Sequence, residues 1–128
     1  MNNKYVIDTS AWIEFLSGTK RGKTAGQFIQ SGLAATPVIV IAELSDKYAR
    51  EGWQAFEEAV NYVNYFTEVF PLTLGISAIS GIVKKEMRVE EKNFSLADGI
   101  ILATARTMNA KVVTGAREFS NAKDAIMI

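Results

Sequence analysis

The sequence predicts an α/β layered fold built on a mostly parallel sheet of four to five strands. Short runs rich in valine and isoleucine alternate with longer segments whose apolar residues recur every three to four positions. These two periods are typical of buried strands and amphipathic helices. Strands that alternate with helices form parallel sheets, because each helix crosses back over a face of the sheet. Residues 1–128 are expected to form a single domain, since a chain of this length can bury one core.

The first third of the chain predicts two strands and two helices. An apolar run from Tyr5 leads into Asp8, and short polar residues directly after a strand are preferred helix caps. In order, we expect a strand over 5–8, a helix capped by Asp8, Thr9 or Ser10 that carries Trp12, Ile13 and Leu16, a basic loop over 18–22, a helix near 24–30 and a strand over 33–36.

The middle of the chain predicts three more amphipathic helices. Thr36 and Pro37 indicate the start of the first one, with threonine as the cap and proline in the first turn, and it should end before Gly52. In the other two, the residues expected in the core are Trp53, Phe56, Val60 and Val63, and, within a helix over 77–91, Ile79, Ile82, Val83 and Met87. The remaining expected elements are a strand over 68–72, a helix from Ser95 to about residue 108, and strands over 111–114 and 125–128.

The residue types that the chain lacks exclude several kinds of chemistry. The sequence contains no cysteine and no histidine. Disulfides, thiol nucleophiles, Cys/His zinc sites and imidazole-based catalysis are therefore excluded. The remaining chemistry depends on carboxylates, lysine, tyrosine or a metal held by oxygen ligands, and oxygen ligands favour magnesium, manganese or calcium.

The overall charge does not indicate a nucleic-acid binder, because 14 basic and 14 acidic side chains balance. Two local basic clusters are either solvated faces or a rim that contacts phosphates. They consist of Lys20, Arg21 and Lys23, and of Lys84, Lys85, Arg88 and Lys92. The apolar stretches are too short for a membrane span, and the one before Asp8 is too short for a signal peptide. We therefore expect a cytoplasmic protein that does not bind a membrane.

Three apolar segments each contain one carboxylate, and these are the candidate functional residues. Asp8, Glu43 and Asp98 all lie among residues expected near the core, where an unpaired charge is costly. Carboxylates that crowd together repel one another unless a cation neutralises them. Asp8 and Thr114 both end predicted strands, so they should meet at the carboxyl edge of the sheet, where sites form in such folds. The pattern favours a shared magnesium or manganese ion, which typically acts on phosphates.

Each carboxylate also has an ordinary structural explanation. Asp8 can cap the helix that follows it. Glu43 can pair with Lys47 one helical turn later, a contact worth a few tenths of a kcal/mol. Asp98 stands three residues after Ser95, which is the spacing of a capping box. A capping role alone would not place Asp98 beside apolar helical neighbours, and the three explanations together are less economical than one shared ion.

Four motifs in order make the whole chain resemble the PIN-domain ribonucleases, above all the VapC-type toxins of toxin–antitoxin pairs. Each motif is weak by itself, and the order and separation of all four carry the resemblance. They are Val6-Ile7-Asp8-Thr9-Ser10, Ala42-Glu43-Leu44, Leu96-Ala97-Asp98 with the apolar helix that follows, and Val113-Thr114-Gly115-Ala116-Arg117-Glu118-Phe119.

The resemblance implies a three-layer α/β/α fold and a metal-dependent ribonuclease activity. It implies that Asp8, Glu43 and Asp98 bind Mg²⁺ or Mn²⁺, and that Ser10 and Thr114 contact the ion, its waters or the phosphate. The family commonly has aspartate where this chain has Ala116. Glu118 is the remaining acid of that motif and is expected to help with catalysis by holding a second ion. RNA as substrate, a protein antitoxin and a homodimer are implied in the same way, with Arg117 or the Lys20 region seating the RNA.

Three other interpretations remain open at the level of sequence. The first is a PIN-like module that binds RNA or protein without cutting, which Ala116 favours. The second is an aspartate-phosphorylated phosphatase or receiver-like domain, although Ser10 and Thr114 stand where those proteins need aspartate and lysine. The third is a purely structural module. The aromatic residues Tyr62, Tyr65 and Phe66 either pack under a neighbouring helix or form a protein interface.

Overall fold

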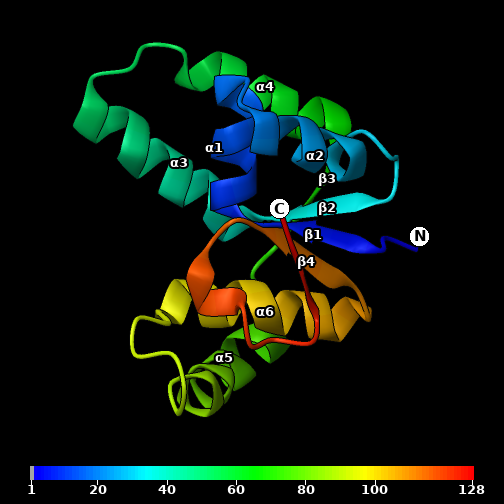
Figure 1. The fold of residues 1–128 in the computed structure, drawn as a ribbon, viewed down its shortest axis with the longest axis vertical. Coiled ribbons are helices and arrows are strands. Elements are labelled where there is room, and N and C mark those ends of the chain that lie inside the picture. Colours follow the sequence, from blue (N-terminus) through cyan, green and yellow to red (C-terminus); the bar gives the residue numbers. More distant parts are fainter. Residues whose placement is uncertain (1) are drawn as a thin grey trace.

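The computed structural model describes residues 2–128 and contains a five-stranded sheet in which all strands are parallel. The strand order is β3-β2-β1-β4-β5, so β1 lies at the centre (Figure 1). The predicted parallel sheet is confirmed, with every strand within two residues of its expected bounds. The strands are β1 (Tyr5–Ile7), β2 (Ala34–Pro37), β3 (Glu68–Phe70), β4 (Lys111–Thr114) and β5 (Ala125–Met127).

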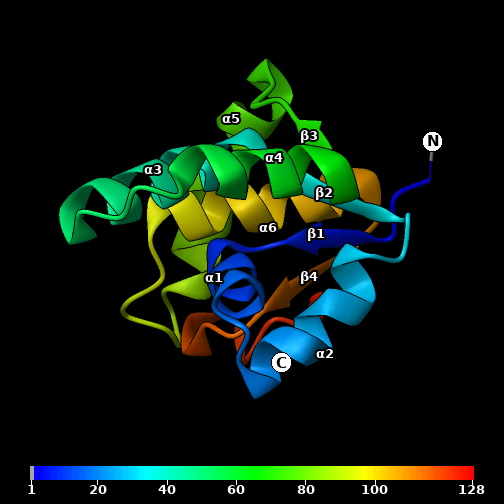
Figure 2. The ribbon, with the colours of Figure 1, turned by 90° about the horizontal axis from the view of Figure 1, so that it is seen from above.

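Within residues 2–128, six helices cover the two faces of the sheet and complete a three-layer α/β/α fold. In Figure 1, α1 to α4 lie on one side of the sheet, and α5 and α6 lie on the other. Figure 2 looks onto the first of these layers, where α1 and α2 run close together. The helices are α1 (Thr9–Ser17), α2 (Lys20–Ile29), α3 (Val38–Glu51), α4 (Phe56–Phe66), α5 (Leu74–Met87) and α6 (Leu96–Met108), with a short 3-10 helix η1 (Arg117–Phe119) after β4.

The core is built around the central strand and helix α6. Val6 and Ile7 of β1 are fully buried, as a strand covered on both faces requires. Helix α6 buries every residue from 99 to 105, because it lies between the sheet and α5. Gly99 allows this close approach: a Cβ atom there would lie 2.7 Å from the backbone oxygen of Ser80 in α5. Helix α6, which carries Asp98, is therefore held firmly in place.

The predicted basic loop over 18–22 is wrong, because α2 already begins at Lys20. Gly18 ends α1 in the left-handed conformation, with φ of 70°. The hydroxyl of Thr19 then accepts a hydrogen bond from the Gly22 amide and caps α2. The basic residues expected in a loop therefore lie on the first turn of a helix.

Thr36 does not cap α3 as predicted, because β2 continues through Pro37. Its hydroxyl instead accepts a hydrogen bond from the Trp12 indole at 3.0 Å and lies 2.7 Å from the hydroxyl of Thr67. These buried polar groups join α1, β2 and the end of α4. The expected end of α3 before Gly52 is confirmed, since Gly52 adopts the left-handed conformation.

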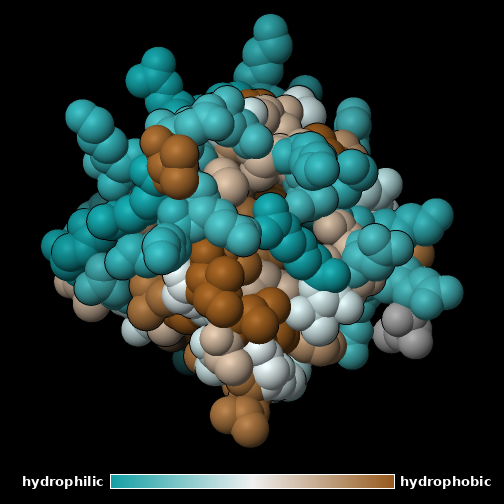
Figure 3. All heavy atoms as spheres, turned by 90° about the horizontal axis from the view of Figure 1, so that it is seen from below, coloured by the Kyte–Doolittle hydropathy of each residue, from teal (hydrophilic) through white to brown (hydrophobic). Residues whose placement is uncertain are grey.

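Two predictions about core residues are also wrong. Trp53 lies before α4 and is 43% exposed, and it packs against Tyr48 with ring centroids 4.9 Å apart. Helix α5 begins at Leu74, earlier than expected, and buries Ile76, Ser80 and Val83. Ile79 and Ile82 are therefore exposed, and Figure 3, which views the molecule from the side of α5, shows apolar side chains among the polar ones there.

Within residues 2–128, no helix is long and apolar enough to cross a membrane.

Two glycines, one on α6 and one on α5, give a matched stability test. Gly99→Ala should destabilise the protein by about 1–3 kcal/mol, because the new methyl group has backbone as its nearest neighbour. Gly81→Ala should instead stabilise it by about 0.5–1 kcal/mol, since Gly81 is an exposed helical position where an added Cβ atom would meet nothing within 4 Å. Urea denaturation measures both, and equal effects of the two substitutions would contradict the tight packing of α6.

Candidate functional site

Asp8 lies where β1 ends and α1 begins, and it is 3% exposed. Its side chain makes no capping hydrogen bond, although it occupies the cap position. The Oδ2 atom instead accepts hydrogen bonds from the hydroxyls of Thr114 at 2.7 Å and Ser10 at 2.9 Å. The structural explanation of Asp8 as a side-chain cap is thus wrong, and its buried carboxylate is held by two hydroxyl groups.

The position of Asp8 follows from the strand order. From β1 the chain moves outward to β2 and β3, and later returns to β4 on the other side of β1. Asp8 follows β1, and Thr114 ends β4, the strand beside it. The connections from these two strands run in opposite directions, and ligand sites in such sheets form beyond the carboxyl ends of the strands at this point. The structure therefore shows the predicted meeting of Asp8 and Thr114 at the carboxyl ends of the strands, and Ser10 contacts both of them.

The segment after β4 is tied to the same hydroxyl groups. The Gly115 amide donates to the Ser10 hydroxyl, and the Ala116 amide donates to the Thr114 hydroxyl, both at 2.9 Å. The hydroxyl oxygens of Ser10 and Thr114 lie 3.2 Å apart. Each hydroxyl therefore has a fixed backbone donor behind it and directs its own proton towards Asp8.

Glu43 reaches the site from α3 and is half-buried. Its Oε1 atom accepts a short hydrogen bond from the hydroxyl of Thr9, the residue after Asp8. The expected ion pair with Lys47 is wrong, because Lys47 pairs with Glu51 at 2.6 Å. Thr9 is the site residue whose role the sequence did not reveal, since a threonine after a strand looks like a helix cap.

Asp98 lies in the first turn of α6 and forms the predicted capping box with Ser95. Its Oδ2 atom accepts from the Ser95 amide at 2.9 Å, and its own amide donates to the Ser95 hydroxyl at 3.0 Å. The capping role is therefore real. It also fixes the carboxylate beside the apolar start of α6, in reach of the charge of Asp8.

Glu118 lies on η1, and the packing of its neighbour brings it towards Asp98. Phe119 is fully buried against Phe94, with ring centroids 5.2 Å apart. Phe94 directly precedes the cap of α6, so this contact joins η1 to the start of the helix. The charge of Glu118 accordingly raises the pKa of Asp98, although burial is the larger cause.

The electrostatics show that the carboxylates lie within reach of one another. Burial raises the pKa of Asp8, opposed by the hydroxyls of Thr114 and Ser10 and assisted by the charge of Glu43. Burial also raises the pKa of Glu43, with the charge of Asp98 adding to the effect. The pKa of Asp98 is raised to about 6, first by burial and further by the charges of Asp8 and Glu118. The site therefore works against the ionisation of its own carboxylates.

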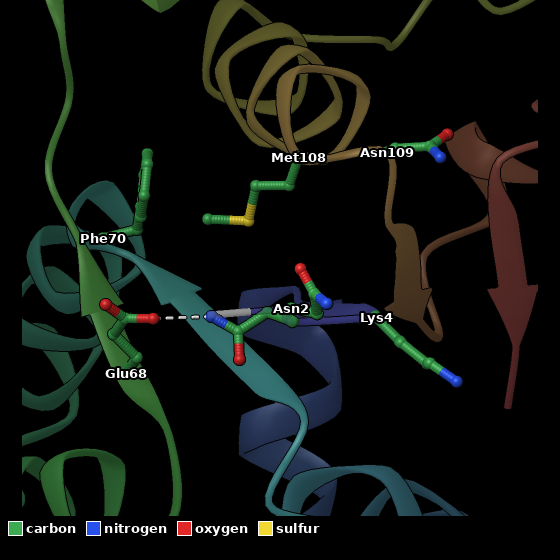
Figure 4. A pocket seen from close by; sticks show the side chains of 7 residues that line it. Asn2, Lys4, Glu68, Phe70, Met108 and Asn109 are labelled. Atoms are coloured by element: carbon green, nitrogen blue, oxygen red, sulfur yellow. Dashed lines mark hydrogen bonds between the residues drawn. The ribbon is translucent and has the colours of Figure 1, made fainter.

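A cavity of about 520 Å³ lies at the amino ends of the strands, away from the carboxylates at their carboxyl ends. Lys4 precedes β1, Glu68 begins β3 and Asn109 precedes β4, so the cavity faces the amino ends of the strands (Figure 4). Asn3 donates to Glu68 at 2.6 Å across its wall. Its lining residues are Asn2, Asn3, Lys4, Glu68, Phe70, Met108 and Asn109.

Comparison with known proteins assigns the chain to a family. A family model of the PIN domain matches residues 5–125. The chain belongs to the PIN domain family. No curated protein matches the sequence.

Solved structures similar to this PIN domain include proteins from three bacteria. A toxin–antitoxin complex from Klebsiella pneumoniae is 20% identical with a TM-score of 0.74, and the match covers 97% of each chain. VapBC2 from Rickettsia felis, bound to a DNA fragment from their promoter, is 16% identical with a TM-score of 0.73 over 97% of this chain and 96% of the other. VapC20 from Mycobacterium tuberculosis, a sarcin–ricin loop cleaving toxin, is 21% identical with a TM-score of 0.70 over 94% and 95%.

The raised pKa of Asp98 makes the stability of the metal-free PIN domain depend on pH. The folded state binds the Asp98 proton more tightly than the unfolded state does, because the folded pKa is about 6 and the ordinary value is 3.8. The resulting destabilisation is complete above about pH 6 and fades as the pH falls towards 3.8. Asp98→Asn removes this charge and keeps an acceptor for the Ser95 amide.

We therefore expect Asp98→Asn to be more stable than the wild type at about pH 8 in the presence of a chelator, and this advantage to shrink towards about pH 4.5. Thermal denaturation across this range measures the difference. A difference that stays constant with pH would contradict the assigned burial and charge crowding of Asp98.

Proposed function

We propose that this PIN domain is a metal-dependent endoribonuclease that hydrolyses RNA phosphodiester bonds, and that it is the toxin of a toxin–antitoxin pair. The observation that carries the proposal is a group of three carboxylates, one directly after β1 and the others on α3 and α6, whose charges raise one another's pKa values. Among residues 2–128, no lysine or arginine forms an ion pair with Asp8, Glu43 or Asp98. Their charges are therefore left for a cation from solution.

The donor set fits magnesium or manganese bound partly through water. All candidate ligands are carboxylate and hydroxyl oxygens, which these hard cations prefer. Within residues 2–128, no three acidic side chains lie close enough together to hold an ion directly. Magnesium usually keeps several waters and uses only one or two protein carboxylates, so the spacing suits it. When bound, such an ion lowers the pKa of a coordinated water and stabilises charge on a phosphate.

The chain's own residues would orient the reacting groups. Ser10 and Thr114 fix Asp8, Thr9 fixes Glu43, and Ser95 fixes Asp98. Asp8, Glu43 and Asp98 would hold the ion, directly or through its coordinated waters, and Glu118 would assist at a second one. Water would add to phosphorus as the bond to the leaving 3′-oxygen breaks, which gives 5′-phosphate and 3′-hydroxyl products. The exposed basic residue Arg117 would contact the RNA backbone.

Asp8→Asn should abolish RNA cleavage in the presence of magnesium or manganese, while the protein remains folded. The substitution keeps the size of the side chain but removes the charge that faces the ion. Cleavage of a mixed RNA panel is the measurement, with a chelator as a second control. Asp124→Asn provides the matched control, since Asp124 pairs with Arg106 at 2.9 Å and precedes β5 at the opposite edge of the sheet.

Full cleavage by Asp8→Asn would contradict the mechanism, and so would cleavage that persists in the chelator. A wild-type protein that binds the metal but cuts no RNA would favour the second candidate function, a PIN-like module that binds without cutting. The observation in favour of that function is Ala116, which offers no carboxylate beside Thr114 at the position where the family commonly has aspartate.

We further propose that a protein antitoxin binds an apolar surface on α1 and α4. A cavity of about 260 Å³ there is lined by Phe15, Leu16, Gln30, Tyr62 and Phe66. Beside it, Tyr65 is 81% exposed, although it is a large aromatic residue. The similar proteins from Klebsiella pneumoniae and Rickettsia felis are toxin–antitoxin complexes, which supports such a partner. A homodimer, which the resemblance also implies, stays a prediction.

Tyr62→Asp should weaken inhibition by the antitoxin without changing cleavage itself, because it places a charge in the apolar surface. Cleavage measured against increasing antitoxin concentration tests this. Leu74→Asp is the matched control, since Leu74 is 88% exposed at the start of α5 on the other side of the sheet. Equal inhibition of the wild type, Tyr62→Asp and Leu74→Asp would show that the antitoxin binds elsewhere.

A further inference from the structure

The side chain of Arg21 reaches from α2 to the segment that follows β4 and to the residue that follows β5. Its Nη2 atom donates to the backbone oxygen of Gly115 at 2.8 Å, and its Nε atom donates to that of Ile128 at 3.3 Å. Its Nη1 atom lies 4.0 Å from a carboxylate oxygen of Glu14. Arg21 is on the first turn of α2, where a positive charge opposes the helix dipole. The helix itself gains nothing from this charge, so the side chain is best described by its contacts with Gly115, Ile128 and Glu14.

Gly115 connects Arg21 to the carboxylate site. Its carbonyl accepts from Arg21, while its amide donates to the Ser10 hydroxyl at 2.9 Å. The Ser10 hydroxyl in turn donates to Oδ2 of Asp8 at 2.9 Å. A Cβ atom at position 115 would lie 2.3 Å from Nη2 of Arg21, so the guanidinium approaches this closely only because residue 115 is glycine. The backbone at Gly115 is thus held from both sides.

We propose that Arg21 is a positioning residue that holds Gly115 so that its amide fixes the Ser10 hydroxyl on Asp8. This inference rests on the proposed function, since its consequence for activity passes through Asp8. Without Arg21, the Gly115 carbonyl must hydrogen-bond to water instead, and the segment after β4 becomes more mobile. The Ser10 hydroxyl then loses its fixed donor and holds Asp8 less well, which lowers the rate because catalytic geometry is demanding.

A direct role in binding RNA predicts a different result. The three nitrogen atoms of Arg21 already face Gly115, Ile128 and Glu14. Its neighbour Lys20 is also exposed and also on the first turn of α2. A positioning role therefore predicts a change in kcat for Arg21 alone, whereas a contact with the RNA backbone predicts a change in KM for either residue.

The first experiment compares the cleavage kinetics of Arg21→Ala, Arg21→Lys and Lys20→Ala. We expect Arg21→Ala to lower kcat by about ten- to a hundredfold with KM within about twofold of the wild type. Arg21→Lys should recover part of the loss, because lysine can still donate to one of the two carbonyls. Lys20→Ala removes the same charge from the same turn and should match the wild type. An increase in KM with unchanged kcat, or an equal loss in Lys20→Ala, would overturn the proposal.

The second experiment is a double-mutant cycle with Gly115→Ala. This substitution keeps the arginine but places a methyl group where the guanidinium lies. It should lower kcat in the wild type and have little further effect in Arg21→Ala, because both changes break the same contact. Fully additive effects of the two substitutions would show that Arg21 does not act through Gly115.

The third measurement does not depend on activity. Hydrogen exchange of the Gly115 amide, followed by NMR, reports its hydrogen bond to Ser10. We expect exchange at least about tenfold faster in Arg21→Ala than in the wild type or Lys20→Ala. If the wild type cuts no RNA but this acceleration is seen, the proposed function fails and the positioning role stands. Unchanged exchange would overturn the positioning role whatever the activity.

Discussion

The structure of the site depends on one buried carboxylate, that of Asp8. It lies at the end of β1, the strand from which the chain adds strands first on one side of the sheet and later on the other. The strand order places Asp8 and Thr114 side by side, and the hydroxyls of Thr114 and Ser10 both donate to it. These two hydrogen bonds favour the charged form, but burial outweighs them and raises the pKa. The fold thus builds a site in which burial works against the charged form of Asp8.

The surrounding elements are arranged to keep further charges near this one. Thr9 holds Glu43, the capping box holds Asp98, and the packing of Phe119 on Phe94 brings Glu118 towards the same place. Each contact uses an ordinary structural device, such as a cap or an aromatic pair. Together they maintain a repulsion that would cost stability in the absence of a ligand, which is typical of functional sites.

The sequence predicts the sheet and the start of α6 well because both depend on local patterns. Valine- and isoleucine-rich runs locate the strands, and Ser95 with Asp98 locates the start of α6. The failures come from tertiary contacts. The local pattern makes Thr36 a helix cap, but Thr36 bonds Trp12, which lies 24 residues away along the chain.

The sequence also does not predict the contacts around the carboxylates, because they join residues that are far apart along the chain. Helical spacing pairs Lys47 with Glu43, but Thr9 takes that carboxylate from another helix. The link from Arg21 through Gly115 to Ser10 joins residues more than 90 positions apart, and no local pattern indicates it.

The central claim is that Asp8, Glu43 and Asp98 share a divalent cation, and calorimetric titration with Mn²⁺ tests it most directly. The expected result is saturable binding by the wild-type protein that is lost in Asp8→Asn and retained in Asp124→Asn. Binding of equal affinity in Asp8→Asn, or no binding by a folded wild-type protein, would contradict the claim. The measurement needs no RNA substrate, so it tests the site independently of the proposed cleavage activity.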